Sequence, residues 1–374
     1  MKIAIIATNY HKIPPEKEIY APLSITERLA DGLVERGHDV TLFASSDSTS
    51  RAKTVGHLPE LSENQKWGDI FNFFTKKTDD SQFGEKAVKY KEVLRGNYEL
   101  LLASEVLKRA DQFDIIQTHS TARIVQMVAQ SKTPVATTFH NPLSYPMESN
   151  LTKVIYEEIS KRNKNIYFIS LSDSQRKDST LPFVQTVYNG IDTEKFSFSK
   201  GERDYLLFVG RMIPRKGVDV AVRVAQKTGK KLVLAGPIYP TRKKYWEEKI
   251  KPHLGKDIVY KGVLSQDDLV ALYKNAEALL MPILGEESFG LVMTEAMSCG
   301  VPVVGYEKSS LPEVVEDGKT GFLVNSEKEL VESIKKIQAI DPLECRKRVE
   351  RKFSTSAMVD GYEEAYKKII KKNA

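Results

Sequence analysis

The sequence has little cysteine and no long hydrophobic run. Cys299 and Cys345 are its two cysteines. Neither has the spacing of a metal site or a histidine close by, so a cytoplasmic location is expected. We expect Cys299 to be a small buried residue and Cys345 to be a surface thiol. No apolar run approaches the ~20 residues of a membrane-spanning helix. The apolar start, MKIAIIATNY, is too short for a signal peptide and is better explained as a first buried strand.

Charge of one sign is not in large excess. The net charge is +6, and 28% of the residues are charged. The lysines are dispersed among glutamates and form no stripe with stacking aromatic residues, which argues against nucleic acid as a partner. Basic residues become denser after the second predicted strand, at Lys66, Lys76, Lys77, Lys86, Lys89, Lys91 and Arg95. A solvated surface explains them, but peripheral contact with the inner face of a membrane is left open.

Apolar runs alternate with helical patterns along the chain, which predicts parallel sheets covered by helices on both faces. In the first half, strands are expected at 2–8, 39–44, 114–118, 135–139 and 166–171, with helices at 23–35, 98–109, 121–130 and 152–162. In the second half, strands are expected at 205–210, 231–235, 258–261, 278–281 and 302–305, with helices near 217–228, 241–251, 266–275, 290–298 and 327–339.

This order predicts an α/β protein with two doubly wound domains that face a cleft. We expect the first domain at 1–197 and the second at 198–354, followed by a helix at about 355–374. Residues 46–96 break the rhythm. They are polar, with Trp67, Phe71, Phe73 and Phe74 close together, and are expected to be an insertion packed on the first domain or lying over the cleft.

The most informative segment is GEESFGLVMTEA, residues 285–296. It connects a predicted buried strand to a helix, so it lies at the carboxyl end of a strand, where ligands bind in a doubly wound sheet. Free amides at the helix start attract anionic oxygen. Glu287 and Glu295 can accept hydrogen bonds from hydroxyl groups, although a carboxylate near a helix start also has a purely structural explanation. A ligand with a phosphate and vicinal hydroxyls, such as a nucleotide sugar, would satisfy amides and acids together.

Two permanent cations follow another predicted strand. Arg211 comes directly after the strand at 205–210, and Lys216 lies just before the next helix. Arginine supplies a planar fork and lysine a mobile point charge, and both suit phosphate oxygens. Solvated charges in a turn would explain either residue alone. Together with the acidic loop downstream, they favour a diphosphate site.

Four motifs occur in the order and at the spacing of one family: Asn189-Gly190-Ile191-Asp192, Phe208-Val209-Gly210-Arg211, Lys216-Gly217, and the Glu-x7-Glu pair Glu287 and Glu295. On these motifs the chain resembles the family 4 retaining glycosyltransferases, over nearly its whole length and most strongly at 189–324. The resemblance implies the GT-B fold, two Rossmann-like domains facing a cleft, and a terminal helix that crosses back to the first domain.

The resemblance also implies roles for individual residues. Arg211, Lys216 and Glu287 are expected to be catalytic, with the two cations at the leaving diphosphate and Glu287 at the hydroxyls of the transferred sugar. Glu295 is expected to accept the ribose hydroxyls. Five further residues of this domain are expected to bind the donor through their backbone. Leu264 is expected near the base and the others near the phosphate: Gly210, Phe289, Gly290 and Leu291.

Two histidines follow predicted strands of the first domain and should face the cleft. The resemblance implies a histidine near the acceptor and the transferred sugar. We therefore expect His119 to be catalytic and His140 to bind substrate, although a structural role explains either one equally well. His38, His57 and His253 have no such placement and are expected at the surface.

Two features bear on the acceptor and on metals. Many members of this family carry a Gly-Gly pair after the first strand, where this chain has Tyr20-Ala21-Pro22. Proline lacks the amide hydrogen, so the usual contact is not expected and the acceptor is in doubt. No Asp-x-Asp triplet occurs in the chain. With Arg211 and Lys216 present, this predicts that no metal is required, and no cofactor is expected.

The expected function is a metal-independent retaining hexosyltransferase that uses a nucleoside diphosphate sugar, with UDP-glucose as the first guess. The acceptor is unknown and is a glycan, a lipid-linked sugar or a small molecule. One alternative is a nucleotide-sugar-binding regulatory subunit without transfer, against which the complete set of site residues argues. The other is a related GT-B epimerase or phosphorylase.

Overall fold

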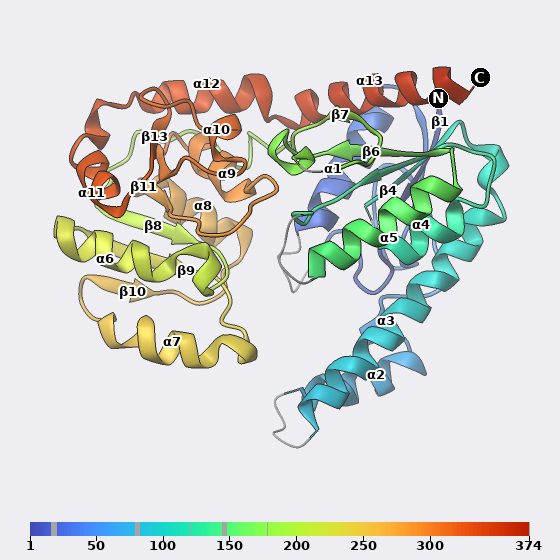
Figure 1. The fold of residues 1–374 in the computed structure, drawn as a ribbon, viewed down its shortest axis with the longest axis horizontal. Coiled ribbons are helices and arrows are strands. Elements are labelled where there is room, and N and C mark those ends of the chain that lie inside the picture. The colour runs from blue at the N-terminus through green and yellow to red at the C-terminus, as the bar shows by residue number, and fades with distance from the viewer. Residues whose placement is uncertain (16–20, 79–82, 120, 144–147, 178, 374) are drawn as a thin grey trace. The chain divides into compact units, whose positions relative to one another are not determined.

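The computed structural model describes residues 1–15, 21–78, 83–119, 121–143, 148–177 and 179–373. The chain divides into two compact units, each built on one parallel sheet (Figure 1). Unit 1 comprises Met1–Leu171, Arg176–Val187 and Met358–Ala374, and unit 2 comprises Ser172–Gln175 and Tyr188–Ala357. The chain thus passes into the second unit near residue 187 and returns after residue 357. The boundary expected from the sequence was residue 197.

Unit 1 contains a seven-stranded sheet in the order β3-β2-β1-β4-β5-β6-β7. Its strands are β1 Lys2–Ile6, β2 Asp39–Phe43, β3 Lys53–Val55, β4 Ile115–Thr118, β5 Val135–Thr138, β6 Ile166–Ser170 and β7 Phe183–Thr186. Its helices are α1 Ala21–Glu35, α2 Trp67–Lys76, α3 Gly84–Leu107, α4 Ala122–Val128, α5 Glu148–Arg162 and, from Met358 on, α13 Thr355–Asn373.

Both faces of the central strands of the unit 1 sheet are buried. Ala4 and Ile6 of β1 belong to a core cluster with residues of α3, α4 and α5. Ile3, which alternates with them and points to the other face, is equally inaccessible. On that face α13 packs on the sheet, and Tyr366 donates a hydrogen bond to Gln117 of β4 (3.2 Å). Burial on both faces explains the nearly continuous apolar runs that marked these strands in the sequence.

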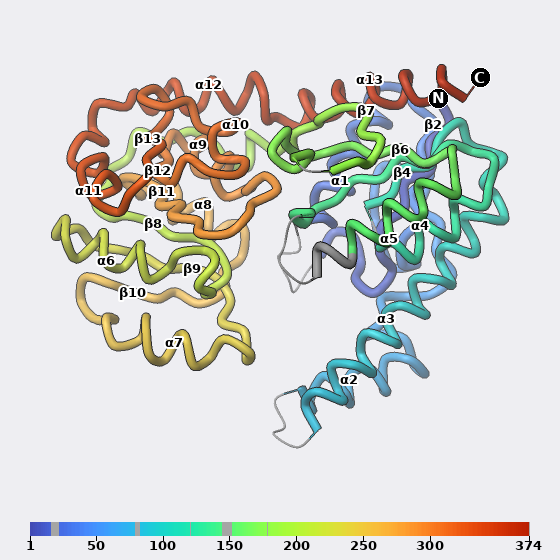
Figure 2. Tube along the Cα trace, in the orientation of Figure 1, coloured from blue at the N-terminus to red at the C-terminus, as the bar shows by residue number. Residues whose placement is uncertain are grey.

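The segment 46–96 packs on unit 1, which is the first of the two placements that the sequence left open. β3 pairs in parallel with β2 and extends the sheet, and α3 begins at Gly84, well before the predicted start. Helices α2 and α3 lie side by side, and Phe74 stacks on Tyr90 with ring centroids 4.8 Å apart (Figure 2). Of the aromatic residues that the sequence grouped, Trp67 and Phe71 pack with Tyr98, whereas Phe73 is 55% exposed.

Unit 2 contains a six-stranded parallel sheet in the order β10-β9-β8-β11-β12-β13. Its strands are β8 Tyr205–Val209, β9 Lys231–Ala235, β10 Ile258–Tyr260, β11 Ala276–Met281, β12 Val303–Tyr306 and β13 Gly321–Val324. Its helices are α6 Val218–Thr228, α7 Lys243–Lys249, α8 Gln266–Lys274, α9 Leu291–Ser298, α10 Leu311–Val314, α11 Glu327–Lys335 and α12 Pro342–Lys352.

Two expectations about single residues were wrong. Cys345 is fully buried, because it lies on the inner face of α12 with Arg348 and Val349, and its thiol contacts the carbonyl oxygen of Thr320 (3.5 Å). His38 is not a free surface residue, since its side chain is only 12% exposed. Cys299 is buried, as expected.

Tyr20 lies outside the described residues, and Pro22 lies in the first turn of α1. Proline suits that position, because the first amides of a helix have no partner within it. Among the described residues, no helix is both long enough and apolar enough to cross a membrane.

Candidate functional site

The loops that follow β8, β11 and β12 meet at the carboxyl edge of the unit 2 sheet. The chain leaves β8 toward β9 on one side and later returns to β11 on its other side. This reversal is the topological switch point, where ligands bind in doubly wound sheets. Arg211 and Lys216 follow β8, and Glu287 follows β11. Three of the expected catalytic residues therefore lie at one switch point.

Lys216 and Glu287 form an ion pair. Lys216 ends a short 3-10 turn, and its Nζ donates to Oε2 of Glu287. Each side chain is only 16% exposed. The close approach of the two loops requires Gly217, which has φ 72°, because a Cβ atom there would lie 1.9 Å from the carbonyl oxygen of Pro282. The glycine of the Lys-Gly motif thus lets the lysine reach the acidic loop.

The surroundings of Glu287 favour its ionised form. Burial raises the pKa of this carboxyl, but the charge and hydrogen bond of Lys216 and the charges of Arg215 and Arg211 outweigh burial, so the pKa lies below its usual value. Glu287 is therefore a carboxylate at neutral pH and can only accept hydrogen bonds. The hydroxyl groups of a ligand could donate hydrogen bonds to Glu287, and its phosphates could bind Lys216 in place of Glu287.

The loop that carries Glu287 is held from the β8 side by Arg215. The carbonyl oxygen of Arg215 accepts hydrogen bonds from the amides of Leu284 (2.9 Å) and Gly285 (3.2 Å). Its Nη1 donates to the carbonyl oxygen of Glu286 (2.6 Å). One residue thus anchors the loop by its backbone and its side chain.

The same loop is held from the β12 side by the residues after Tyr306. Lys308 Nζ donates to the carbonyl oxygen of Leu284 (2.7 Å), and the amide of Glu287 donates to Oγ of Ser309 (2.7 Å). Sequence reasoning missed Arg215, Lys308 and Ser309, because their partners are mainly backbone atoms of a loop distant in the sequence. No local pattern signals such contacts.

Phe289 and Gly290 lead into α9. Phe289 is 2% exposed, and its ring packs against Tyr188 and Phe353, so it could meet a ligand only through its backbone. Gly290 has φ 83°, and no side chain caps the helix that begins at Leu291. Within the described part of the chain, no side chain caps the amides of Leu291 and Val292, which are available to an anionic group, whereas the amide of Met293 donates to the carbonyl oxygen of Gly290 (2.9 Å).

Glu295 lies one turn into α9 and is half-buried. Its Oε2 accepts a hydrogen bond from the hydroxyl of Tyr273 (2.8 Å). Burial, with a smaller contribution from the charge of Glu295, raises the pKa of Tyr273 well above its usual value, so the phenol remains a donor. This anchor was not predicted, because Tyr273 falls on the apolar face of α8 and the sequence there shows no sign of a polar partner.

The remaining expected residues of unit 2 lie at the same carboxyl edge, toward β9 and β10. The amide of Gly210 donates to the carbonyl oxygen of Ala235 (2.9 Å) and joins the ends of β8 and β9. Leu264 is half-buried in the loop between β10 and α8. Its neighbour Val263 is 61% exposed.

The two strand-end histidines of unit 1 form a pair. His119 follows β4 and His140 follows β5, and His119 Nδ1 lies 2.9 Å from His140 Nε2. One ring must donate to the other, which couples their tautomers. Burial lowers the pKa of His140 to about 4. Burial and the charge of His140 lower the pKa of His119 well below its usual value. Both rings are therefore neutral at pH 7.

Polar residues of β4, β5 and α13 surround this pair. Gln117 Nε2 donates to Thr138 Oγ1 (3.1 Å), which lies 3.0 Å from the hydroxyl of Tyr362. The rings of His119 and Tyr362 have centroids 6.0 Å apart. The terminal helix thus helps to place His119.

Glu99 of α3 is a buried carboxyl group that sequence reasoning missed. It is 2% exposed and accepts a hydrogen bond from Thr121 Oγ1 (3.1 Å). Burial raises its pKa to about 7, against hydrogen bonds from Thr121 and Thr8 and the charge of Arg123. Thr8 follows β1 and Thr121 follows β4, the two strands at the switch point of this sheet. Glu99 therefore links the loops that follow these two strands.

The depressed pKa of His140 predicts a pH-dependent stability. Between about pH 6.5 and pH 4 the unfolded chain binds a proton at this residue that the folded chain resists, so the free energy of unfolding should fall as the pH falls. His140→Gln should reduce the drop in melting temperature between pH 7 and pH 4.5, as measured by calorimetry. His57→Gln is the matched control, because His57 is 58% exposed. Equal pH profiles for His140→Gln and the wild type would contradict this prediction.

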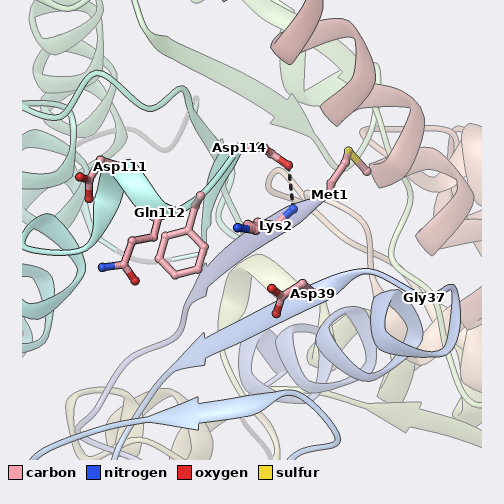
Figure 3. A pocket seen from close by; sticks show the side chains of 8 residues that line it. Met1, Lys2, Gly37, Asp39, Asp111, Gln112 and Asp114 are labelled. Carbon is pink, nitrogen blue, oxygen red and sulfur yellow. Dashed lines mark hydrogen bonds between the residues drawn. The ribbon is translucent and has the colours of Figure 1, made fainter.

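The hollow shown in Figure 3 lies at the opposite end of the unit 1 sheet. It has a volume of about 430 Å³ and is lined by Lys2, Asp39 and Asp114, which lie at the amino ends of β1, β2 and β4. The amide of Lys2 donates to Asp114 Oδ2 across it (2.7 Å). In doubly wound sheets ligands bind at the carboxyl ends, so we assign this hollow no function. Among the described residues, no three His, Cys, Asp or Glu side chains are grouped to hold a metal ion.

Comparisons with known proteins agree with this architecture. Residues 24–195 match the family described as Glycosyltransferase Family 4, and residues 191–352 match the family described as Glycosyl transferases group 1. Together the two matches cover residues 24–352 and support a glycosyltransferase similar to family 4, with the GT-B type of fold.

Relatives cover the chain to different extents. An uncharacterised protein of the cps region of Klebsiella pneumoniae is 34% identical over 44% of this chain and 47% of its own length. The chain spans about half the length of the first curated relatives. An uncharacterised glycosyltransferase of Methanocaldococcus jannaschii is 26% identical over 87% of this chain and 85% of its own. The structure of the Anabaena protein HepE with UDP and glucose has a TM-score of 0.70 at 17% identity, over 98% of this chain and 100% of that one, which shows a shared fold.

Proposed function

We propose that this protein transfers a hexose from a nucleoside diphosphate sugar to an acceptor, with retention of configuration and without a metal ion. The observation that carries the proposal is the ion pair of Lys216 and Glu287 at the switch point of unit 2. A half-buried cation beside a half-buried carboxylate gives a donor for phosphate and an acceptor for sugar hydroxyls side by side. UDP-glucose is the first donor to test, and the solved relative with UDP and glucose supports that choice.

In this proposal the leaving diphosphate is met by positive charge. Arg211 and Lys216 are preorganised at the carboxyl end of β8, and the first amides of α9 add partial positive charge. Lys216 would move from Glu287 to a phosphate oxygen when the donor binds. Glu287 would then accept hydrogen bonds from the sugar hydroxyls, while Glu295, steadied by Tyr273, would accept those of the ribose.

Unit 1 would bind the acceptor. The neutral His119 and His140 can accept or donate hydrogen bonds at neutral pH, and His119 would face the transferred sugar. Glu99 is buried and already hydrogen-bonded, so it is not placed as a nucleophile. This supports transfer on one face of the sugar, in which the leaving phosphate takes the proton of the acceptor hydroxyl.

Two measurements test the proposal. A thermal-shift screen of nucleoside diphosphates should identify the base, because a ligand at 100 times its Kd stabilises a protein by about 2.7 kcal/mol. Product analysis with a labelled donor then separates transfer from the alternatives. A regulatory subunit would bind the donor without turnover, an epimerase would return an altered donor, and a phosphorylase would release a sugar phosphate.

Metal independence gives a further expected result. Transfer should continue at an unchanged rate in a strong chelator, because Arg211 and Lys216 neutralise the diphosphate. The measurement is the initial rate with and without chelator, followed by addition of manganese or magnesium. Loss of turnover that a divalent ion restores, and that buffer exchange alone does not, would show that a metal is required.

Peripheral membrane contact remains a prediction. Six large hydrophobic residues of α2 and α3 are exposed, at Ile70, Phe73, Val88, Tyr90, Val93 and Leu101, and they lie near the lysines that suggested such a contact. Co-sedimentation with anionic vesicles would test it. Such a contact would bring the enzyme to a lipid-linked acceptor in the membrane.

A further inference from the structure

We infer that Ser309 is a positioning residue, which fixes the Glu287 loop for transfer of the sugar. The inference rests on the proposed function, in which Glu287 contacts the donor sugar. It depends on two independent observations: the contacts of the Ser309 hydroxyl and the backbone conformation of Ser309. Ser309 follows β12, which neighbours the β11 strand that leads to Glu287.

The hydroxyl of Ser309 lies at the centre of the acidic loop. Its Oγ accepts a hydrogen bond from the amide of Glu287 (2.7 Å). The same atom lies 2.8 Å from the carbonyl oxygen of Glu287 and 2.9 Å from Oε2 of Glu286. A hydroxyl has one hydrogen, so it donates to one of these two acceptors at a time. Ser309 therefore contacts the backbone of Glu287, rather than its carboxylate.

The backbone of Ser309 is held in an unfavourable conformation. Its φ is 58°, and it is the one residue other than glycine with a positive φ in the described part of the chain. A side chain other than glycine in the left-handed region carries a conformational cost. Glycine would remove this cost and would also remove the hydroxyl. That serine occupies the position indicates that its hydroxyl contributes something that glycine cannot.

The neighbours of Ser309 strengthen the same clamp. Lys308 Nζ donates to the carbonyl oxygen of Leu284, and Ser310 Oγ donates to the carbonyl oxygen of Phe289 (3.0 Å). Three consecutive residues thus hold both ends and the middle of the loop. Small errors in the placement of a group that acts on the reacting sugar cost large factors in rate. Ser309 is therefore placed to affect turnover more than donor binding.

The test compares Ser309→Gly and Ser309→Ala with the wild type in two measurements. Hydrogen exchange of the peptide covering residues 284–291 should be faster in both variants, because the amide of Glu287 loses its acceptor. Transfer should show a kcat at least tenfold lower, while the affinity for the nucleoside diphosphate stays within about threefold. The melting temperature of Ser309→Gly should be equal to or above that of Ser309→Ala, because glycine relieves the backbone conformation.

Ser326→Ala is the matched control. Ser326 Oγ accepts a hydrogen bond from the amide of Glu329 at the start of α11, so this variant loses a comparable hydroxyl away from the loop. It should lower the melting temperature without changing exchange at 284–291 or kcat. Unchanged exchange in Ser309→Gly, or faster exchange with unchanged kcat, would overturn the inference. If the wild type itself transfers no sugar, the proposed function fails, whereas the exchange experiment still reports on the clamp.

Discussion

Lys216→Ala should lower kcat/KM by about 10²–10³-fold, the scale for removing one preorganised donor to developing charge. Lys216 is the cation nearest to Glu287, and its side chain is 16% exposed, so little water can replace it at a phosphate. Arg211→Ala should cause a loss of the same order, because its charge also acts at this edge. Steady-state kinetics with the donor identified by the thermal-shift screen measures both losses.

A charge-matched control separates catalysis from general electrostatics. Lys227→Ala removes the same charge from unit 2, but Lys227 is 57% exposed and pairs with Glu327 away from the site. It should leave kcat/KM within about twofold. Both site variants should fold, with melting temperatures close to that of the wild type. Near-normal kcat/KM in both Arg211→Ala and Lys216→Ala would show that the diphosphate binds elsewhere.

The core strands could be predicted because their burial leaves a direct mark on the sequence. β11 is buried at all six positions and was recognised from its apolar run alone. β3 and β13 were missed, since their residues are only partly buried and include Lys53 and Gly321. Short strands at a sheet edge have little apolar surface to bury, so their sequences resemble loops.

Helix α12 also shows how burial without an apolar pattern escapes sequence-based prediction. α12 was missed although Cys345, Arg348 and Val349 share its buried face, because arginine is unusual in a core and most residues of this helix are charged. The buried Arg348 is compatible with the core because its guanidinium donates to the carbonyl oxygens of Val314 and Glu313 and pairs with the carboxylate of Glu316. Tertiary partners of this kind have no local sequence signature.

The sequence predicted individual residues of the site, and the structure shows the contacts between them. The sequence identified Lys216 and Glu287 separately, and the structure joins them in an ion pair. It identified His119 and His140 separately, and the structure joins their rings by a hydrogen bond. The supporting residues Tyr273 and Ser309 were missed, since neither lies in a motif and each acts through a partner that is distant along the chain. Motifs indicate which groups meet a ligand, whereas the groups that hold them are decided by packing.

The final prediction separates the two glutamates of the Glu-x7-Glu pair. Glu295→Gln keeps a carbonyl oxygen that can accept from Tyr273, so the fold should persist, but it removes the charge that strengthens hydrogen bonds from ribose hydroxyls. Affinity for the free nucleoside diphosphate should weaken by about 1–3 kcal/mol. Glu287→Gln should behave differently. It frees Lys216 from its ion pair, so diphosphate affinity should stay within about threefold or increase, while transfer falls tenfold or more because the sugar loses its acceptor.

Calorimetric titration with the diphosphate, together with transfer rates, measures both effects. Glu344→Gln provides the control, because it makes the same change of charge on α12, where Glu344 pairs with Lys347, and it should alter neither quantity. Equal losses of diphosphate affinity in the two site variants would refute the division of roles, since a carboxylate that contacts only the sugar cannot affect a ligand that lacks it. A loss of affinity in Glu287→Gln alone would instead mean that the roles of the two residues are exchanged.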